Sequence, residues 1–295
     1  MKKEDQNEPR KGQWDHYIKV NGTYYKKVAC KEPSGKTAVN LIATSVATIK
    51  EDLRHSNILM IPQYNGFTNV PENDPDKYQR VFSVREIGID TLLYNLYSPV
   101  NFNPTDGEYN NIDKVLRHLF DGDNYEKAIL YLKNLYMHPA MRQPIICLFG
   151  GQSTGKTTFL HLLKAIYDEN MRLLDFERIR SKFNYSWAGK LIIGVDEAFC
   201  DDNDLQTVKF CLKSIQTNDT ITIKRKGADE ETLPNFTKTI ICTQDDRLAN
   251  MVSDLGGWIC PVSTIPGGER DPHILDKIVT EIPSFLNHLI NSINP

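Results

Sequence analysis

Features that identify several common classes of protein are missing from this sequence of 295 residues. Its six cysteines include no Cys-x-x-Cys pair, and four lie in apolar runs, which favours buried thiols over zinc ligands or disulfides. No apolar run approaches the ~20 residues that cross a bilayer. The charged N-terminal stretch MKKEDQNEPRKGQW lacks the apolar core of a signal peptide. We therefore expect a soluble protein of the cytoplasm with no membrane partner.

An excess of positive charge is also missing, since the formal net charge is −3. A protein-wide basic field that could hold nucleic acid is thereby excluded. Any nucleic-acid binding must come from a local patch, or from a patch repeated around an oligomer.

Residues 14–104 show mixed signals after a polar stretch, 1–13, that we expect to be disordered. Asn21-Gly22 lies between alternating segments and predicts a hairpin turn. Short apolar stretches separated by Pro, Asn, Asp and Gly predict short strands and loops. No acidic set typical of a polymerase or primase is present, so we interpret this part as a mixed α+β accessory or collar module. Its aromatics Tyr24, Tyr25, Tyr64 and Phe67 are expected to pack internally rather than to stack on bases.

Residues 105–295 are predicted to form one domain with three parts. Apolar residues at helical spacing predict two amphipathic helices in a lead-in, 105–143, that ends near His138-Pro139. A core at 144–265 and a C-terminal helical segment at 266–295 follow.

The core alternates buried strands with helices. Continuous apolar runs at 145–149 and 190–195, and a third after the hairpin that begins TITIKRKG, are typical of buried parallel strands. Helices are predicted at 156–167 and 203–216. The alternation predicts an α/β fold in which helices flank a parallel sheet.

A glycine-rich turn connects the first of these strands to its helix. Gly150-x-x-x-x-Gly155-Lys156-Thr157 matches the P-loop pattern in the required context of strand, loop and helix. Its backbone N–H groups suit a pyrophosphate, Lys156 would reach the β- and γ-oxygens, and the Thr157 hydroxyl would ligate Mg²⁺. We therefore predict that ATP and Mg²⁺ bind at Gly150, Gly151, Gln152, Ser153, Thr154, Gly155, Lys156, Thr157 and Thr158.

Polar residues end the next two predicted strands. Asp196 follows the run LIIGV, where a metal-holding Walker B aspartate should stand, and Glu197 beside it is placed to polarise the attacking water. An Asp-Glu pair points to hydrolysis rather than to binding alone. Gln244 follows the third strand and could sense the γ-phosphate through an amide hydrogen bond.

These elements, in this order, resemble superfamily 3 helicases, which are AAA+-related motors of viruses, phages and mobile elements. The span from about 104 to 265 resembles the helicase part of phage-type primase–helicases. The resemblance is carried by GGQSTGKTT, FNYSWAGKLIIGVDEAF, TITIKRKGADEETLPNFTKTIICTQDD and the later Trp258.

The resemblance implies a P-loop NTPase fold of AAA+-like type. It also implies an ATP-dependent DNA helicase of phage or mobile-element replication in a bacterial host cell. It assigns Lys224, Arg225 and Lys226 to a nucleic-acid-binding hairpin that moves along single-stranded DNA. Implied partners are single-stranded or forked DNA, further copies of the chain in a ring, with a hexamer favoured, and a separate primase or polymerase.

The sequence departs from the family at two positions. Gln244 stands where the family usually has Asn, and Gly256-Gly257-Trp258 stands where it often has an arginine that acts on the neighbouring subunit's ATP. Arg270 is our preferred substitute, because Arg247 is placed to pair with Asp245 or Asp246. The missing arginine keeps open a nucleotide-binding regulatory protein with weakened ATPase activity.

A P-loop kinase of small molecules is the third hypothesis. It is less favoured, because 149 residues precede Gly150 and no arginine-rich lid is visible.

Overall fold

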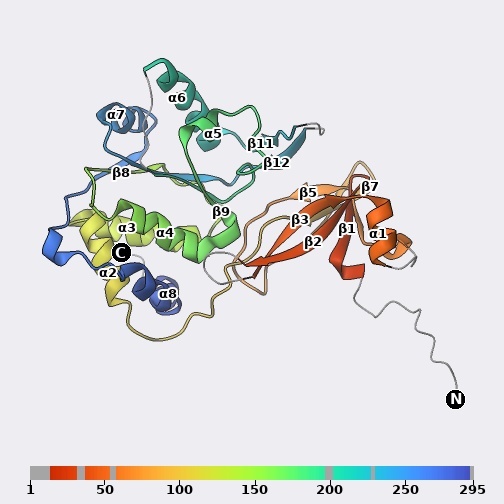
Figure 1. Ribbon diagram of the computed structural model, residues 1–295, viewed down its shortest axis with the longest axis horizontal. Coiled ribbons are helices and arrows are strands. Elements are labelled where there is room, and N and C mark those ends of the chain that lie inside the picture. Colours follow the sequence, from red (N-terminus) through yellow and green to blue (C-terminus); the bar gives the residue numbers. More distant parts are fainter. Residues whose placement is uncertain (1–13, 32–36, 54–57, 197–201, 227–229, 293–295) are drawn as a thin grey trace. The chain divides into compact units, whose positions relative to one another are not determined.

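The computed structural model describes residues 14–31, 37–53, 58–196, 202–226 and 230–292 (Figure 1). The chain divides into two compact units that alternate along the sequence: Met1–Thr68 with Gln79–Leu96, and Asn69–Tyr78 with Tyr97–Pro295. The module 14–104 and the domain 105–295 remain predictions, and residues 1–13 lie outside the described part of the chain.

The first unit contains two small sheets. One has the order β3-β2-β1-β4 and the other the order β5-β7-β6. Helix α1 (Val46–Asp52) is capped at its start by the Ser45 side chain and buries Ile49 against Tyr17. The strands are β1 (Tyr17–Val20), β2 (Thr23–Lys31), β3 (Thr37–Thr44), β4 (Gln63–Tyr64), β5 (Gly66–Thr68), β6 (Val81–Glu86) and β7 (Ile89–Asn95).

The predicted hairpin at Asn21-Gly22 is confirmed. These residues connect β1 to β2 with φ values of 44° and 81°, the left-handed conformation that such a two-residue turn requires. Tyr25 and Phe67 are buried and pack edge to face with ring centroids 5.4 Å apart. Both aromatics therefore belong to the core of this unit, as predicted.

The second unit is built on a five-stranded parallel sheet with the order β14-β8-β13-β10-β9. In Figure 1, α5, α6 and α7 lie on one face of this sheet, and α2, α3, α4 and α8 lie on the other. The predicted α/β fold with a parallel sheet flanked by helices is thus confirmed. The strands are β8 (Ile146–Phe149), β9 (Met171–Leu174), β10 (Ile192–Val195), β13 (Lys238–Thr243) and β14 (Trp258–Pro261).

Apolar patterning explains the main elements of this unit. Strands β8 and β10 are continuous apolar runs, and β13 contains the apolar run 240–242. All three are buried over nearly their whole length, as strands covered on both faces require. The helices are α2 (Asn110–Leu119), α3 (Asp123–Met137), α4 (Lys156–Tyr167), α5 (Phe176–Arg180), α6 (Asp202–Thr217), α7 (Asp246–Asp254) and α8 (Ile274–Asn291). Helix α3 ends at His138, where the sequence predicts its end. An antiparallel ribbon of β11 (Thr220–Ile223) and β12 (Glu231–Pro234) precedes β13.

Three of the four cysteines predicted to be buried thiols are fully buried. Cys147, Cys242 and Cys260 lie in the strands of the sheet, whereas Cys211 is half-buried. Burial raises the pKa of Cys147 and of Cys260 to about 12, so these thiols stay protonated and unreactive at neutral pH. Within the described ranges, no helix has the length and apolar character that a bilayer crossing needs.

Candidate functional site

The loop between β8 and α4 is attached to both strands that flank β8. The Gly150 N–H donates to the Thr243 carbonyl of β13 at 3.0 Å. A Cβ atom on Gly150 would lie 2.3 Å from the carbonyl oxygen of Val262, which follows β14, so only glycine fits there. Gly155, the last residue before α4, has a φ of 84° and also requires a left-handed conformation.

Two further contacts fix the outer side of this loop. The Ile265 N–H donates to the Ser153 carbonyl at 3.1 Å. His118, in the last turn of α2, lies with its Nε2 3.2 Å from the Thr154 carbonyl oxygen. The loop is therefore positioned by the sheet on one side and by α2 and the chain after β14 on the other.

Lys156 begins α4 and points back over the loop. Its Nζ donates to the carbonyl oxygens of Gly150 at 2.7 Å and Gly151 at 2.5 Å, and to the Thr154 hydroxyl at 2.9 Å. A positive charge is thus held at the centre of the glycine-rich turn, next to the N-terminus of a helix. Both features favour an anionic ligand.

The ends of β10 and β13 complete a cleft of about 630 Å³ beside this loop. Residues 151–158 line it together with Asp196, Thr243, Gln244 and Asp245. Because β13 lies between β8 and β10, Gln244 lies between the loop and Asp196 in the sheet order. The structure therefore brings together the predicted residues of the loop, Asp196 and Gln244, whereas Glu197 lies outside the described residues.

Thr157 and Asp196 form the part of the cleft that suits a metal ion. The Thr157 hydroxyl donates to Asp196 Oδ1 at 3.2 Å, so two hard oxygen ligands lie side by side. Among the described residues, no group of three or more His, Cys, Asp or Glu side chains could hold a metal. The Thr157 hydroxyl and the Asp196 carboxylate together fit Mg²⁺, which proteins commonly bind through one or two carboxylates and phosphate oxygens of a substrate.

A second cavity of about 290 Å³ adjoins the cleft. Helix α2 and the chain from Ile265 to Ile274 form its walls, and Ser153, Gly155 and Thr158 belong to the lining of both cavities. Its lining combines apolar side chains with a few polar ones, the mixture typical of small-molecule pockets. The apolar lining residues are Val115, Leu119, Ile265 and Ile274, and the polar side chains include Asn111, Lys114, His118, Arg270 and Asp271.

Two arginines were candidates for the missing family arginine. Arg247 pairs with Asp245 at 2.7 Å, as predicted, and this contact holds the pKa of the Asp245 carboxyl below its usual value. Arg270 is exposed, donates from Nε to the Ile265 carbonyl at 3.3 Å and lines the second cavity. Its action on a neighbouring subunit remains a prediction.

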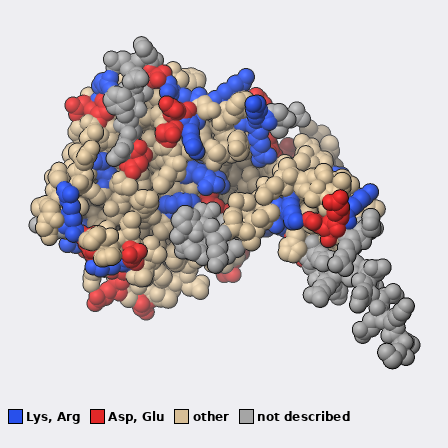
Figure 2. Space-filling model, in the orientation of Figure 1, with Lys and Arg blue, Asp and Glu red and all other residues tan. Residues whose placement is uncertain are grey.

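The three predicted nucleic-acid-binding residues follow β11. The Lys224 Nζ lies 3.0 Å from the Glu230 carboxylate, while Arg225 is half-buried and Lys226 exposed. The Asn184 side chain aligns this ribbon, since it donates to the Thr222 carbonyl at 2.9 Å and accepts from the Lys224 N–H at 2.8 Å. Figure 2 shows basic and acidic side chains interspersed on the visible surface of the second unit, with no continuous basic band.

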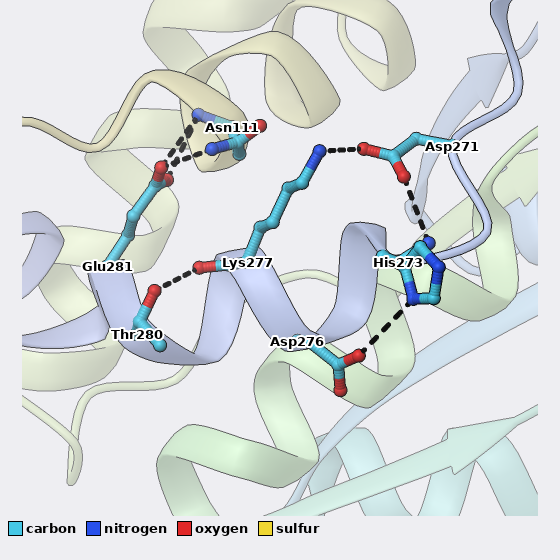
Figure 3. A network of polar contacts seen from close by, with 7 residues as sticks. All are labelled: Asn111, Asp271, His273, Asp276, Lys277, Thr280 and Glu281. Atoms are coloured by element: carbon cyan, nitrogen blue, oxygen red, sulfur yellow. Dashed lines mark hydrogen bonds and ion pairs between the residues drawn. The ribbon is translucent and has the colours of Figure 1, made fainter.

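Figure 3 shows a polar network on α8 that the sequence did not reveal. The Glu281 carboxylate accepts hydrogen bonds from the backbone N–H groups of Asn111 and Ile112, at 3.0 and 2.9 Å, in the first turn of α2. Lys277, one turn earlier on α8, pairs with Asp271 at 2.6 Å. About 170 residues separate Glu281 from Asn111, so no local pattern could have indicated this contact.

Comparisons with known proteins found one family model and one curated relative that match parts of the chain. A family model described as "Family of unknown function (DUF5906)" matches residues 148–254. The DNA primase-polymerase of Nitratiruptor phage NrS-1 is 27% identical over 190 residues. This match covers 62% of the chain and 25% of the phage protein, so the chain spans about a quarter of the length of this curated relative.

Solved structures of the C-terminal region of the NrS-1 protein extend the similarity to most of the chain. One apo structure has a TM-score of 0.72 at 19% identity, covering 94% of this chain and 66% of the other. An A-form apo structure has a TM-score of 0.71 at 19% identity, covering 95% and 68%. The chain therefore shares the fold of the C-terminal region of the NrS-1 primase-polymerase.

Proposed function

We propose that the chain is the ATP-hydrolysing motor of a phage-type DNA replication protein, related to superfamily 3 helicases. The observation that carries the proposal is the 630 Å³ cleft, in which a P-loop sequence lies beside Asp196 and Gln244. The matched relative, named a DNA primase-polymerase, supports a role in DNA replication.

In this proposal the loop residues 150–158 bind the phosphates of Mg-ATP. Lys156 contacts the β- and γ-phosphates, and Thr157 and Asp196 hold Mg²⁺, which would neutralise charge that develops on the phosphates. Gln244 contacts the γ-phosphate. Glu197, which lies outside the described residues, is proposed to orient and deprotonate the attacking water.

The second cavity supports a nucleotide rather than free phosphate as the ligand. It adjoins the loop at Ser153 and Gly155, and its mixed lining could accept a base and sugar whose phosphates lie on the loop. The ribbon bearing Arg225 and Lys226 is proposed to contact the DNA backbone, and a ring of subunits would repeat this weak basic patch.

The test is ATP hydrolysis by the purified chain with and without single-stranded DNA, beside its native mass. Stimulation by DNA in a multimer supports the motor, and Glu197→Gln should then keep ATP binding while turnover collapses. No ATP binding to the parent protein overturns the proposal, and turnover only with a small acceptor indicates a kinase.

A nucleotide-binding regulatory protein with weakened hydrolysis is the second candidate. It is favoured because this chain has Gly257 and Trp258, and no arginine, at the position where superfamily 3 helicases often have one. A Cβ atom on Gly257 would lie 2.4 Å from the Val252 side chain, and Trp258 packs on Phe120 with ring centroids 5.4 Å apart. ATP binding without DNA-stimulated turnover would support this candidate.

A further inference from the structure

Helix α2 connects two contacts that lie at its opposite ends. At its start, Glu281 of α8 accepts from the N–H groups of Asn111 and Ile112. In its last turn, His118 contacts the carbonyl of Thr154 in the phosphate loop at 3.2 Å. A helix of 10 residues is about 15 Å long, so one rigid element connects α8 to the loop.

The contact with Glu281 caps the start of α2, where the helix has no capping side chain of its own. The N-cap residue of α2, Tyr109, makes no side-chain capping hydrogen bond. The first N–H groups of a helix need acceptors, and a carboxylate there also interacts favourably with the helix dipole. Glu281 provides both from another helix, and it also accepts from the Asn111 side-chain amide at 2.5 Å.

The same helix α8 fixes the other wall of the second cavity. Lys277 pairs with Asp271, and the Asp271 carboxylate accepts from the His273 N–H at 2.9 Å (Figure 3). Asp271 and Asn111 both line that cavity, from different segments of the chain. One helix thus holds both walls next to the loop.

We propose that Glu281 is a positioning residue for the nucleotide site, acting through α2 and His118 on the carbonyl of Thr154. The proposal rests on the proposed function, in which the loop binds nucleotide phosphates. The His118 contact requires a proton on Nε2, because a carbonyl oxygen only accepts. If α2 shifts away from the loop, His118 no longer donates to the Thr154 carbonyl and the cavity loses one wall. Both losses weaken nucleotide binding equally before and during hydrolysis.

The test compares Glu281→Gln, His118→Leu and their double variant with the parent protein. Mg-ATP affinity is measured by titration calorimetry, and KM and kcat by steady-state hydrolysis. We expect each single variant to weaken affinity and raise KM by about tenfold, with kcat unchanged, because uniform binding is lost. The double variant should be no worse than either single one, since both act through one helix.

Controls separate positioning from stability. His118→Gln offers an N–H donor near the position of Nε2 and should restore affinity. Glu126→Gln removes an equal charge from the first turn of α3 and should change neither affinity nor KM. The thermal unfolding midpoint of every variant is measured without nucleotide.

Unchanged ATP affinity in Glu281→Gln, with or without a lowered unfolding midpoint, overturns the positioning role and leaves the proposed function intact. If Glu281→Gln does not fold, His118→Leu with full affinity has the same consequence. A parent protein that binds no ATP overturns the proposed function and this inference together.

Discussion

The loop 150–158 and the ribbon of β11 and β12 are both proposed to bind phosphates, but the two regions are built differently. The loop is fixed by backbone contacts to β13 and to the chain after β14 and by the His118 side chain of α2, and it holds one lysine at its centre. The cations after β11 lie on a surface turn, where Lys224 already pairs with Glu230. The first arrangement selects one ligand geometry, whereas the second attracts any polyanion.

Because the two sites are built differently, we expect the removal of one side chain to have a different effect on ligand binding at each. A preorganised cradle loses much of its function when one group is removed. Exposed cations contribute small, additive and salt-dependent increments. The predictions below address that contrast, beginning with the largest expected effect.

Lys156→Ala removes the charge at the centre of the cradle and leaves its backbone in place. We expect kcat to fall by roughly 10²–10³-fold, the usual effect of removing one transition-state donor, and ATP binding to weaken. Steady-state hydrolysis measures this, with Lys213→Ala on the exposed face of α6 as the matched control. A Lys156→Ala protein that hydrolyses ATP at the parent rate would exclude the P-loop assignment.

Gly150→Ala tests whether the backbone of the cradle is fixed. Its new Cβ would lie 2.3 Å from the Val262 carbonyl, so we expect a loss of about 1–3 kcal/mol in the free energy of unfolding. Gly151→Ala is the control, since nothing lies within 4 Å of its Cβ, and its cost should stay within about 0.5 kcal/mol. Urea unfolding of both variants measures the difference, and equal costs would contradict this description of the loop.

Asp196→Ala tests the metal part of the cleft. The variant loses the carboxylate beside the Thr157 hydroxyl, so Mg²⁺ should no longer strengthen ATP binding. We expect the affinity for ATP to fall at least about tenfold with Mg²⁺ present and to change little with EDTA. Titration under both conditions measures this, and an equal loss in the two would argue against a metal role.

The double variant Arg225→Ala with Lys226→Ala tests the ribbon. Loss of two phosphate contacts should lower the slope of log affinity against log salt for single-stranded DNA by about 1.4, while basal ATP hydrolysis persists. Fluorescence anisotropy at several salt concentrations gives the slope, with Lys213→Ala again as the control. An unchanged slope would remove these residues from the DNA contact.

Lys224→Ala should have the smallest effect. Lys224 already pairs with Glu230 at 3.0 Å, so its loss exposes a carboxylate as it removes a cation. Exposed pairs contribute about 0–1 kcal/mol, and we expect DNA affinity to change less than in the double variant. The same anisotropy assay decides, and a loss larger than that of the double variant would reverse the ranking.

Within the parallel sheet, the sequence predicts the three central strands, which contain clear apolar runs, and misses the two edge strands. Strands β8, β10 and β13 each contain an apolar run, as strands buried on both faces require. Strand β9 carries Arg172 and a partly exposed Leu173, as an edge strand can, and β14 is a four-residue strand that ends in proline. Short edge strands with such residues give no clear period.

One missed element did have a usable signal. Helix α7 begins after Asp245, whose side chain accepts from the Arg247 N–H, and it buries Leu248 and Val252 on one face. An N-cap aspartate before apolar residues four apart is a standard helix start.

The residues of the candidate site also differ in whether local sequence patterns predict them. Lys156, Thr157 and Asp196 could be named from local patterns, because each lies at the end of a predicted strand or the start of a predicted helix. His118 and Glu281 could not, because their contacts join segments 36 and 170 residues apart. Such contacts depend on how helices pack, which a single sequence does not state.

Lys238 is a buried lysine in the parallel sheet. It begins β13, at the opposite end of the strand from Gln244, and its Nζ donates to the carbonyls of Pro139 and Phe236. Burial lowers its pKa to about 7. Between about pH 7 and 10.5 the unfolded chain binds more protons, so this lysine should make stability rise with pH in that window.

The order of strands in the sheet has a consequence for how the protein folds during synthesis. Strand β8 is the first strand of this sheet to be synthesised, yet its two neighbours, β13 and β14, lie about 90 and 110 residues later in the chain. Pairings between such distant segments form slowly, because a long loop must close first. On the ribosome, the glycine-rich turn therefore cannot acquire its final shape until the polypeptide beyond Ile265 has emerged.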